Sequence, residues 1–129
     1  MEEKHFTYRK LRVYHEAKKY VLLIYQLIKA FPKEETFALS DQLRRASVSI
    51  VSNIVEGASR SSQKEQAHFI EIAYGSLSET MCQIEIAYEL SYIDSRQLKE
   101  VEELYNTIAQ MLSGLKRRTR SEERGTRSV

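Results

Sequence analysis

The sequence predicts an all-α protein, an antiparallel up-down four-helix bundle. Four segments repeat apolar residues at steps of three and four, the spacing that places them on one face of an α-helix. Short polar stretches separate these segments, and short connections favour antiparallel neighbours in a bundle. One proline and four glycines in 129 residues leave the helices with few interruptions.

The composition predicts one soluble domain. A hydrophobic content of 42% suits a packed core in a chain of this length. The single Cys82 excludes an internal disulfide and a cysteine-based zinc cage, and it suits a reducing cytoplasm. The polar N-terminus is unlike a signal peptide, and the longest apolar run, residues 20–25, is too short to span a bilayer. We therefore expect a cytoplasmic protein.

The first helix is predicted to span about residues 11–31, because Pro32 disfavours helical geometry at Phe31. Glu16 is the only acid among the basic residues of its polar face. These basic residues are Arg9, Lys10, Arg12, Lys18, Lys19 and Lys29. Two interpretations are open: a solvated surface, or a stripe that binds an acidic partner.

The second helix is predicted to begin between Lys33 and Ser40 and to end near Ser59. On a helical projection its apolar residues cover an arc of roughly 200°, although a helix that covers one core needs little more than about 100°. One interpretation is a helix buried deeply in its own bundle. The other is a helix that also packs against a neighbouring subunit.

Arg44 lies inside this wide apolar arc, beside Val48, Val51 and Val55. A charge there is costly unless it is paired. In an oligomer, Arg44 would pair with a glutamate across the interface. The alternative is a pair within the helix, because Asp41 lies three residues earlier.

The third helix is predicted to start at a capping box formed by Ser62 and Glu65 and to end near Tyr92. A left-handed helix stop is predicted at Gly57 or shortly after it. The apolar stripe comprises Phe69, Ile72, Ala73, Ser76, Leu77, Thr80, Ile84, Ala87 and Ser91. Four glutamates make this helix acidic where the first is basic, which suggests that the two are antiparallel neighbours.

The fourth helix is predicted to start at a cap formed by Asp94 and Gln97. Its heptad stripe comprises Leu98, Val101, Tyr105, Ile108, Leu112 and Leu115. The bundle is therefore predicted to occupy residues 1–115. Residues 116–129 carry six basic residues and two glutamates, and are predicted to form a disordered tail that either contacts a polyanion or keeps the protein soluble.

The sequence offers little catalytic chemistry. Glu65 and His68 form one Glu-x-x-His pair, but a di-metal bundle site needs two. Three scattered histidines do not indicate a catalytic triad, and there is no glycine-rich phosphate loop. We expect no enzyme activity, no cofactor and no metal.

Several separated motifs are similar to one family. They are RRASVSIVSNIVEGASR (residues 44–60), FIEIAYGSLSE (69–79), YIDSRQL (92–98) and LRVYHEA (11–17), together with the Phe31-Pro32 pair. The chain resembles the four-helix-bundle family of 23S rRNA intervening-sequence proteins, also called S23 ribosomal proteins, over about residues 6–116. That family is bacterial, and it resembles accessory proteins of diversity-generating retroelements, which form pentamers and bind nucleic acid and a reverse transcriptase. The resemblance implies a homopentamer with nucleic-acid affinity, and it supplies no catalytic residues.

The resulting hypothesis is an oligomeric, non-enzymatic bundle that binds RNA or DNA non-specifically through backbone charge. The predicted nucleic-acid contacts are Arg45, Lys18, Lys19, Lys116, Arg117, Arg118 and Arg120. The predicted oligomer interface comprises Arg44, Val48, Val51 and Val55. The alternatives are a protein-protein adaptor without direct nucleic-acid binding and a self-assembling protein without a ligand.

Overall fold

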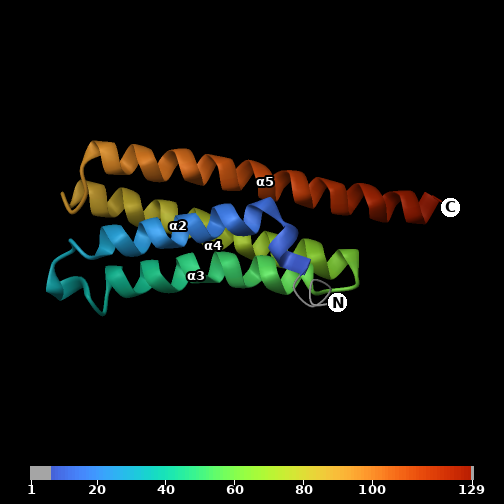
Figure 1. The fold of residues 1–129 in the computed structure, drawn as a ribbon, viewed down its shortest axis with the longest axis horizontal. Helices are drawn as coiled ribbons and strands as arrows, with labels where there is room; N and C mark the ends of the chain where they lie inside the picture. The colour runs from blue at the N-terminus through green and yellow to red at the C-terminus, as the bar shows by residue number, and fades with distance from the viewer. Residues whose placement is uncertain (1–6, 129) are drawn as a thin grey trace.

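The structure is a computed structural model that describes the backbone of residues 7–128 and the side chains of residues 7–119. The elements are η1 (Thr7–Lys10), α2 (Arg12–Ile28), η2 (Lys33–Glu35), α3 (Leu39–Ala58), α4 (Gln63–Glu89) and α5 (Ser95–Ser128). Residues 7–128 contain no strand, and the four long helices run up and down beside one another (Figure 1). The predicted fold class is confirmed.

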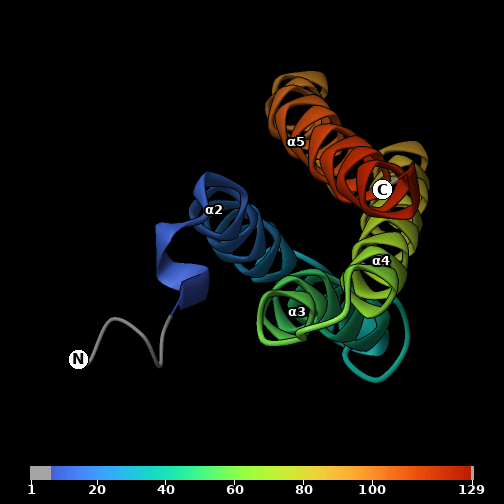
Figure 2. The ribbon, with the colours of Figure 1, turned by 90° about the vertical axis from the view of Figure 1, so that its right-hand side faces the viewer.

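The order of helices around the bundle is α2, α3, α4, α5 (Figure 2). The most extensive packing joins α4 to α3 and to α5, and α2 closes the bundle against α3 and α5. The predicted contact between the basic first helix and the acidic third helix is therefore wrong, because α2 and α4 lie diagonally opposite. Short connections make consecutive helices antiparallel, so α2 and α4 run in the same direction.

The core follows the predicted stripes with local differences. All four long helices contribute side chains that are fully buried: Tyr20, Ile24, Leu43, Ile50, Leu77, Thr80, Ile84, Val101, Ile108 and Leu112. In α4, Ile70 is buried instead of Ile72, which is 37% exposed. The reason is that α4 turns a continuous face toward both α3 and α5, so its buried arc is shifted from the predicted stripe.

The helix ends agree with the predictions at two caps and differ at the end of α3. The Ser62 hydroxyl accepts the Glu65 amide at 3.2 Å, and Asp94 and Gln97 exchange two hydrogen bonds at 2.8 and 2.9 Å. The predicted left-handed stop at Gly57 is wrong, because Gly57 is a buried helical residue without a positive φ. The left-handed residue is instead Ser91, with φ 65°.

Ser91 closes α4 with a Schellman motif. Its amide donates to the Tyr88 carbonyl and the Tyr92 amide donates to the Ala87 carbonyl, both at 2.9 Å. Because a side chain at positive φ is strained, we expect Ser91→Gly to raise the free energy of unfolding by about 1 kcal/mol. Ser78→Gly, at an exposed position inside α4, should lower it by roughly 0.5 kcal/mol. Urea denaturation followed by circular dichroism measures both, and a loss of stability in Ser91→Gly would contradict the expected strain.

The helix α5 continues past the predicted domain boundary at Leu115. Thr119 is buried, and its hydroxyl donates to the Leu115 carbonyl at 3.0 Å. Thr119 lies one heptad after Leu112, so the stripe extends by one further turn. The side chain of Arg120 lies outside the described residues. Between residues 7 and 128, no helix combines the length and hydrophobicity needed to cross a bilayer.

Candidate nucleic-acid interface

A groove lies between the start of α2 and the C-terminal part of α5. Its volume is about 590 Å³. Apolar residues and three arginines line it: Leu11, Arg12, Val13, Met111, Gly114, Leu115, Arg117 and Arg118. The groove is open because η1 turns away from α5 before α2 begins, while α5 extends beyond that point (Figure 1, Figure 2).

The three groove arginines, Arg12, Arg117 and Arg118, are exposed. Among the described side chains, no carboxylate lies within 4 Å of their guanidinium groups. Their charges are therefore available to an anion. Lys116 differs, because it points toward α4 and its ammonium lies 2.6 Å from the Glu71 carboxylate.

The predicted lysines of α2 lie one to two turns beyond Arg12. Lys19 forms an ion pair with Glu16 at 2.9 Å, and the Lys18 ammonium lies 5.0 Å from the centre of the Tyr14 ring. Both side chains are exposed. They extend the basic surface along α2, although one of the two charges is already paired.

The structure does not bring Arg45 to this surface. Arg45 lies on α3, its side chain is 81% exposed, and its Nε lies 3.0 Å from the Asp41 carboxylate. The predicted contacts are therefore divided between the groove, the α2 lysines and an isolated arginine. Arg12 belongs to the basic face of the first helix, whose lysines and arginines are expected to contact nucleic acid. Only its position opposite Arg117 and Arg118 singles it out.

Arg44 has partners within its own chain. Its guanidinium donates to the Thr36 carbonyl at 2.9 Å and lies 3.7 Å from the Asp41 carboxylate. The contact with Asp41 matches the predicted pair within the helix. The hydrogen bond to Thr36 connects Arg44 to the turn before α3. Of the three valines, Val48 is 42% exposed, Val55 is partly buried and Val51 packs against the core. The interface made by Arg44 and these valines stays a prediction.

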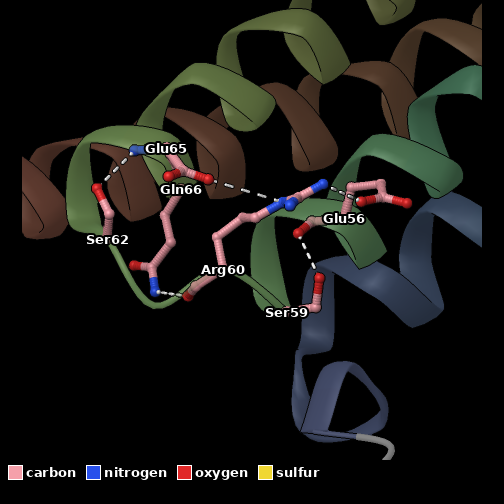
Figure 3. A network of polar contacts seen from close by, with 6 residues as sticks. All are labelled: Glu56, Ser59, Arg60, Ser62, Glu65 and Gln66. Atoms are coloured by element: carbon pink, nitrogen blue, oxygen red, sulfur yellow. Dashed lines mark hydrogen bonds and ion pairs between the residues drawn. The ribbon is translucent and has the colours of Figure 1, made fainter.

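The third basic residue of the motif at residues 44–60 is Arg60, which lies at the corner between α3 and α4 (Figure 3). Its guanidinium donates to Glu56 at 2.7 Å, lies 4.0 Å from Glu65 and stacks 4.9 Å from the centre of the Phe69 ring. Its carbonyl accepts the Gln66 side-chain amide at 2.8 Å. The charge of Arg60 is balanced locally, so this cluster connects two helices and leaves no free cation.

No metal site is evident among the described side chains, since no group of three or more His, Cys, Asp or Glu is placed to hold an ion. Two tyrosines among the described side chains have raised pKa values. Burial raises the pKa of Tyr20, and the hydrogen bond to the Glu35 carboxylate raises the pKa of Tyr92. Neither shift creates a general acid or base that works near neutral pH.

Comparison with known proteins agrees with the fold. Residues 9–114 match the model of the family described as "23S rRNA-intervening sequence protein". The chain is similar to a solved structure from Bacteroides thetaiotaomicron, a protein of unknown function from the S23 ribosomal protein family. The two chains share 24% identity with a TM-score of 0.75, over 81% of this chain and 95% of the other. No curated protein matches the chain.

Proposed function

The chain belongs to the 23S rRNA-intervening sequence protein family, and we propose that it is a non-enzymatic protein that binds RNA or DNA through the phosphate backbone. The observation that carries this proposal is the meeting of Arg12, Arg117 and Arg118 at one groove, where none of the three pairs with a carboxylate of residues 7–119. Guanidinium groups suit phosphate because they present several donors in a planar fork. Non-specific binding needs charge more than shape.

Salt titration tests the proposal. The affinity for a 20-nucleotide RNA is measured by fluorescence anisotropy between 50 and 200 mM salt. The logarithm of the association constant should fall linearly with the logarithm of the salt concentration, with a slope of about −0.7 for each phosphate contacted. Reversing all three groove arginines (Arg12→Glu, Arg117→Glu, Arg118→Glu) should lower the affinity at low salt on the order of 100-fold and flatten the slope by about 2.

The matched control carries the same change of net charge away from the groove: Lys29→Glu, Lys33→Glu and Arg45→Glu, all at exposed positions. It should lose much less affinity, because screening limits the effect of distant charges. Equal losses in both triple variants would refute the groove as the binding site. An unmodified protein that retains no RNA or DNA at low salt would refute nucleic-acid binding itself.

A specific observation favours self-association as a second candidate property. The outer face of α4 exposes Ile72 and Ile86, at 37% and 43%, and Leu90, the residue that follows the helix, is 50% exposed. Glutamates surround these residues on the same helix: Glu71, Glu79, Glu85 and Glu89. The outer face of α2 exposes Leu22 and Tyr25, at 69% and 39%, near the lysines Lys18 and Lys29.

These two faces are complementary in charge and lie on opposite sides of the bundle, because α2 and α4 are diagonal (Figure 2). Such an arrangement favours a head-to-tail contact, in which the α4 face of one copy packs against the α2 face of the next. Repeated contacts of this kind form a ring if the rotation between successive copies closes. A ring of five is the state that the family resemblance implies.

Light scattering tests this contact. The unmodified protein should have a mass several times the 15.1 kDa of one chain, and Ile86→Asp should return it to a monomer because the contact would bury an unpaired charge. Val48→Asp, at a similarly exposed position on α3, is the control. Dissociation by Val48→Asp alone would place the contact on α3 instead, and a monomeric unmodified protein at micromolar concentration would refute self-association.

A further inference from the structure

We propose that the groove between α2 and α5 binds an unstacked base of a single-stranded nucleic acid, with the flanking phosphates on the arginines. This inference rests on the proposed function and narrows it to one class of nucleic acid. The groove has two chemically different parts. The arginines supply positive charge, and Leu11, Val13, Met111 and Leu115 supply an apolar lining.

The apolar lining is the feature that phosphate contact leaves unexplained. Phosphate oxygens are satisfied by cationic donors and water, and they gain nothing from aliphatic carbon. An anion with a flat apolar body satisfies both parts of the groove at once. A nucleotide with an exposed base is such an anion, because each base has an apolar face and guanidinium planes also stack on it.

Duplex nucleic acid does not offer this combination. Its bases are stacked and paired, so they present polar edges in the grooves and phosphates outside. A single strand exposes the faces of its bases, and the volume of about 590 Å³ lies within the roughly 300–1,000 Å³ of typical ligand sites. The groove therefore fits a single strand better than a duplex.

Gly114 keeps the groove open in the middle of its α5 wall. A Cβ at this position would meet only the Arg117 guanidinium, at an ordinary contact distance of 3.8 Å. A Cβ therefore fits here without meeting the core, and a longer side chain would extend into the groove without changing its charge. Gly114→Leu also replaces a poor helix former with a good one, so folding is preserved.

The test compares three fluorescein-labelled ligands of equal length at one salt concentration: single-stranded oligothymidine, an abasic single strand with the same phosphates, and a DNA duplex. The unmodified protein should bind oligothymidine about 5- to 100-fold more tightly than the abasic strand, and more tightly than the duplex. Gly114→Leu should lower the oligothymidine affinity to that of the abasic strand, and it should change the abasic affinity much less, through its contact with Arg117 alone. Asn106→Leu, at an exposed position on the same helix, should change neither.

The comparison of ligands on the unmodified protein does not depend on any variant. Equal affinity for oligothymidine and the abasic strand would refute base insertion and leave phosphate binding intact. Tighter binding of the duplex than of oligothymidine would also refute base insertion and leave phosphate binding intact. Binding to vesicles of anionic lipid, with no binding to any of the three oligonucleotides, would refute base insertion and the proposed function together.

Discussion

Replacing Tyr20 by alanine is expected to lower the free energy of unfolding by about 3–5 kcal/mol. The Tyr20 ring is fully buried in the core, and its hydroxyl lies 2.8 Å from the Thr80 hydroxyl. This bond joins α2 to α4 across the diagonal of the bundle, where the backbones of the two helices lie further apart than those of neighbouring helices. The control is Leu22→Ala, at a position 69% exposed, which should change stability by less than about 0.5 kcal/mol. Urea denaturation measures both, and equal effects would contradict the described core.

The direction of this hydrogen bond predicts different losses of stability for changes at Thr80 and at Tyr20. Thr80 donates to the Leu77 carbonyl at 2.6 Å, so Tyr20 is the donor to Thr80. Thr80→Val leaves the Tyr20 hydroxyl buried without an acceptor and should cost about 1–3 kcal/mol, whereas Tyr20→Phe should cost only about 1 kcal/mol. The double variant should lose less than the sum of the two. Additive losses would show that the two hydroxyls do not interact.

Alanine at Gly57 is expected to lower the free energy of unfolding by up to about 2 kcal/mol, because an overpacking cost of about 1–3 kcal/mol is only partly offset by the better helix propensity of alanine. The new Cβ would lie 3.2 Å from the Phe69 Cβ and 3.4 Å from the Gln66 carbonyl oxygen. The Phe69 Cβ is attached directly to the α4 backbone, so it cannot rotate away and the two helices must separate. This cost exceeds the roughly 1 kcal/mol that alanine gains over glycine inside a helix.

Gly75→Ala is the matched substitution, because a Cβ there would meet nothing within 4 Å. It should raise the free energy of unfolding by about 0.5–1 kcal/mol. Opposite signs for the two glycines are therefore expected in the same denaturation experiment. A gain of stability at both positions would show that α3 and α4 are not in the close contact described.

The glycine at position 57 also shows where local sequence signals are sufficient and where they are not. The caps at Ser62 and Asp94 were predicted because the hydrogen bonds involve residues three positions apart, which sequence spacing reveals directly. A glycine near a helix end has two uses, a left-handed turn or a close approach of another helix. Gly57 has the second use, and Phe69 and Gln66 belong to a different helix. The left-handed position went to Ser91, whose residue type carries no such signal.

The sequence by itself determined the four helices, most of their buried faces and the excess of basic residues after Leu115, because helical periodicity and charge depend on each segment alone. Only the tertiary structure decided which charges are free. It placed Arg12 opposite Arg117 and Arg118, left Arg45 on a separate face, and paired Lys116 with Glu71. The physical reason is that the residues that share one face of a helix are set by the spacing within that helix. Which turn of α5 lies beside which turn of α2 depends instead on the packing of all four helices.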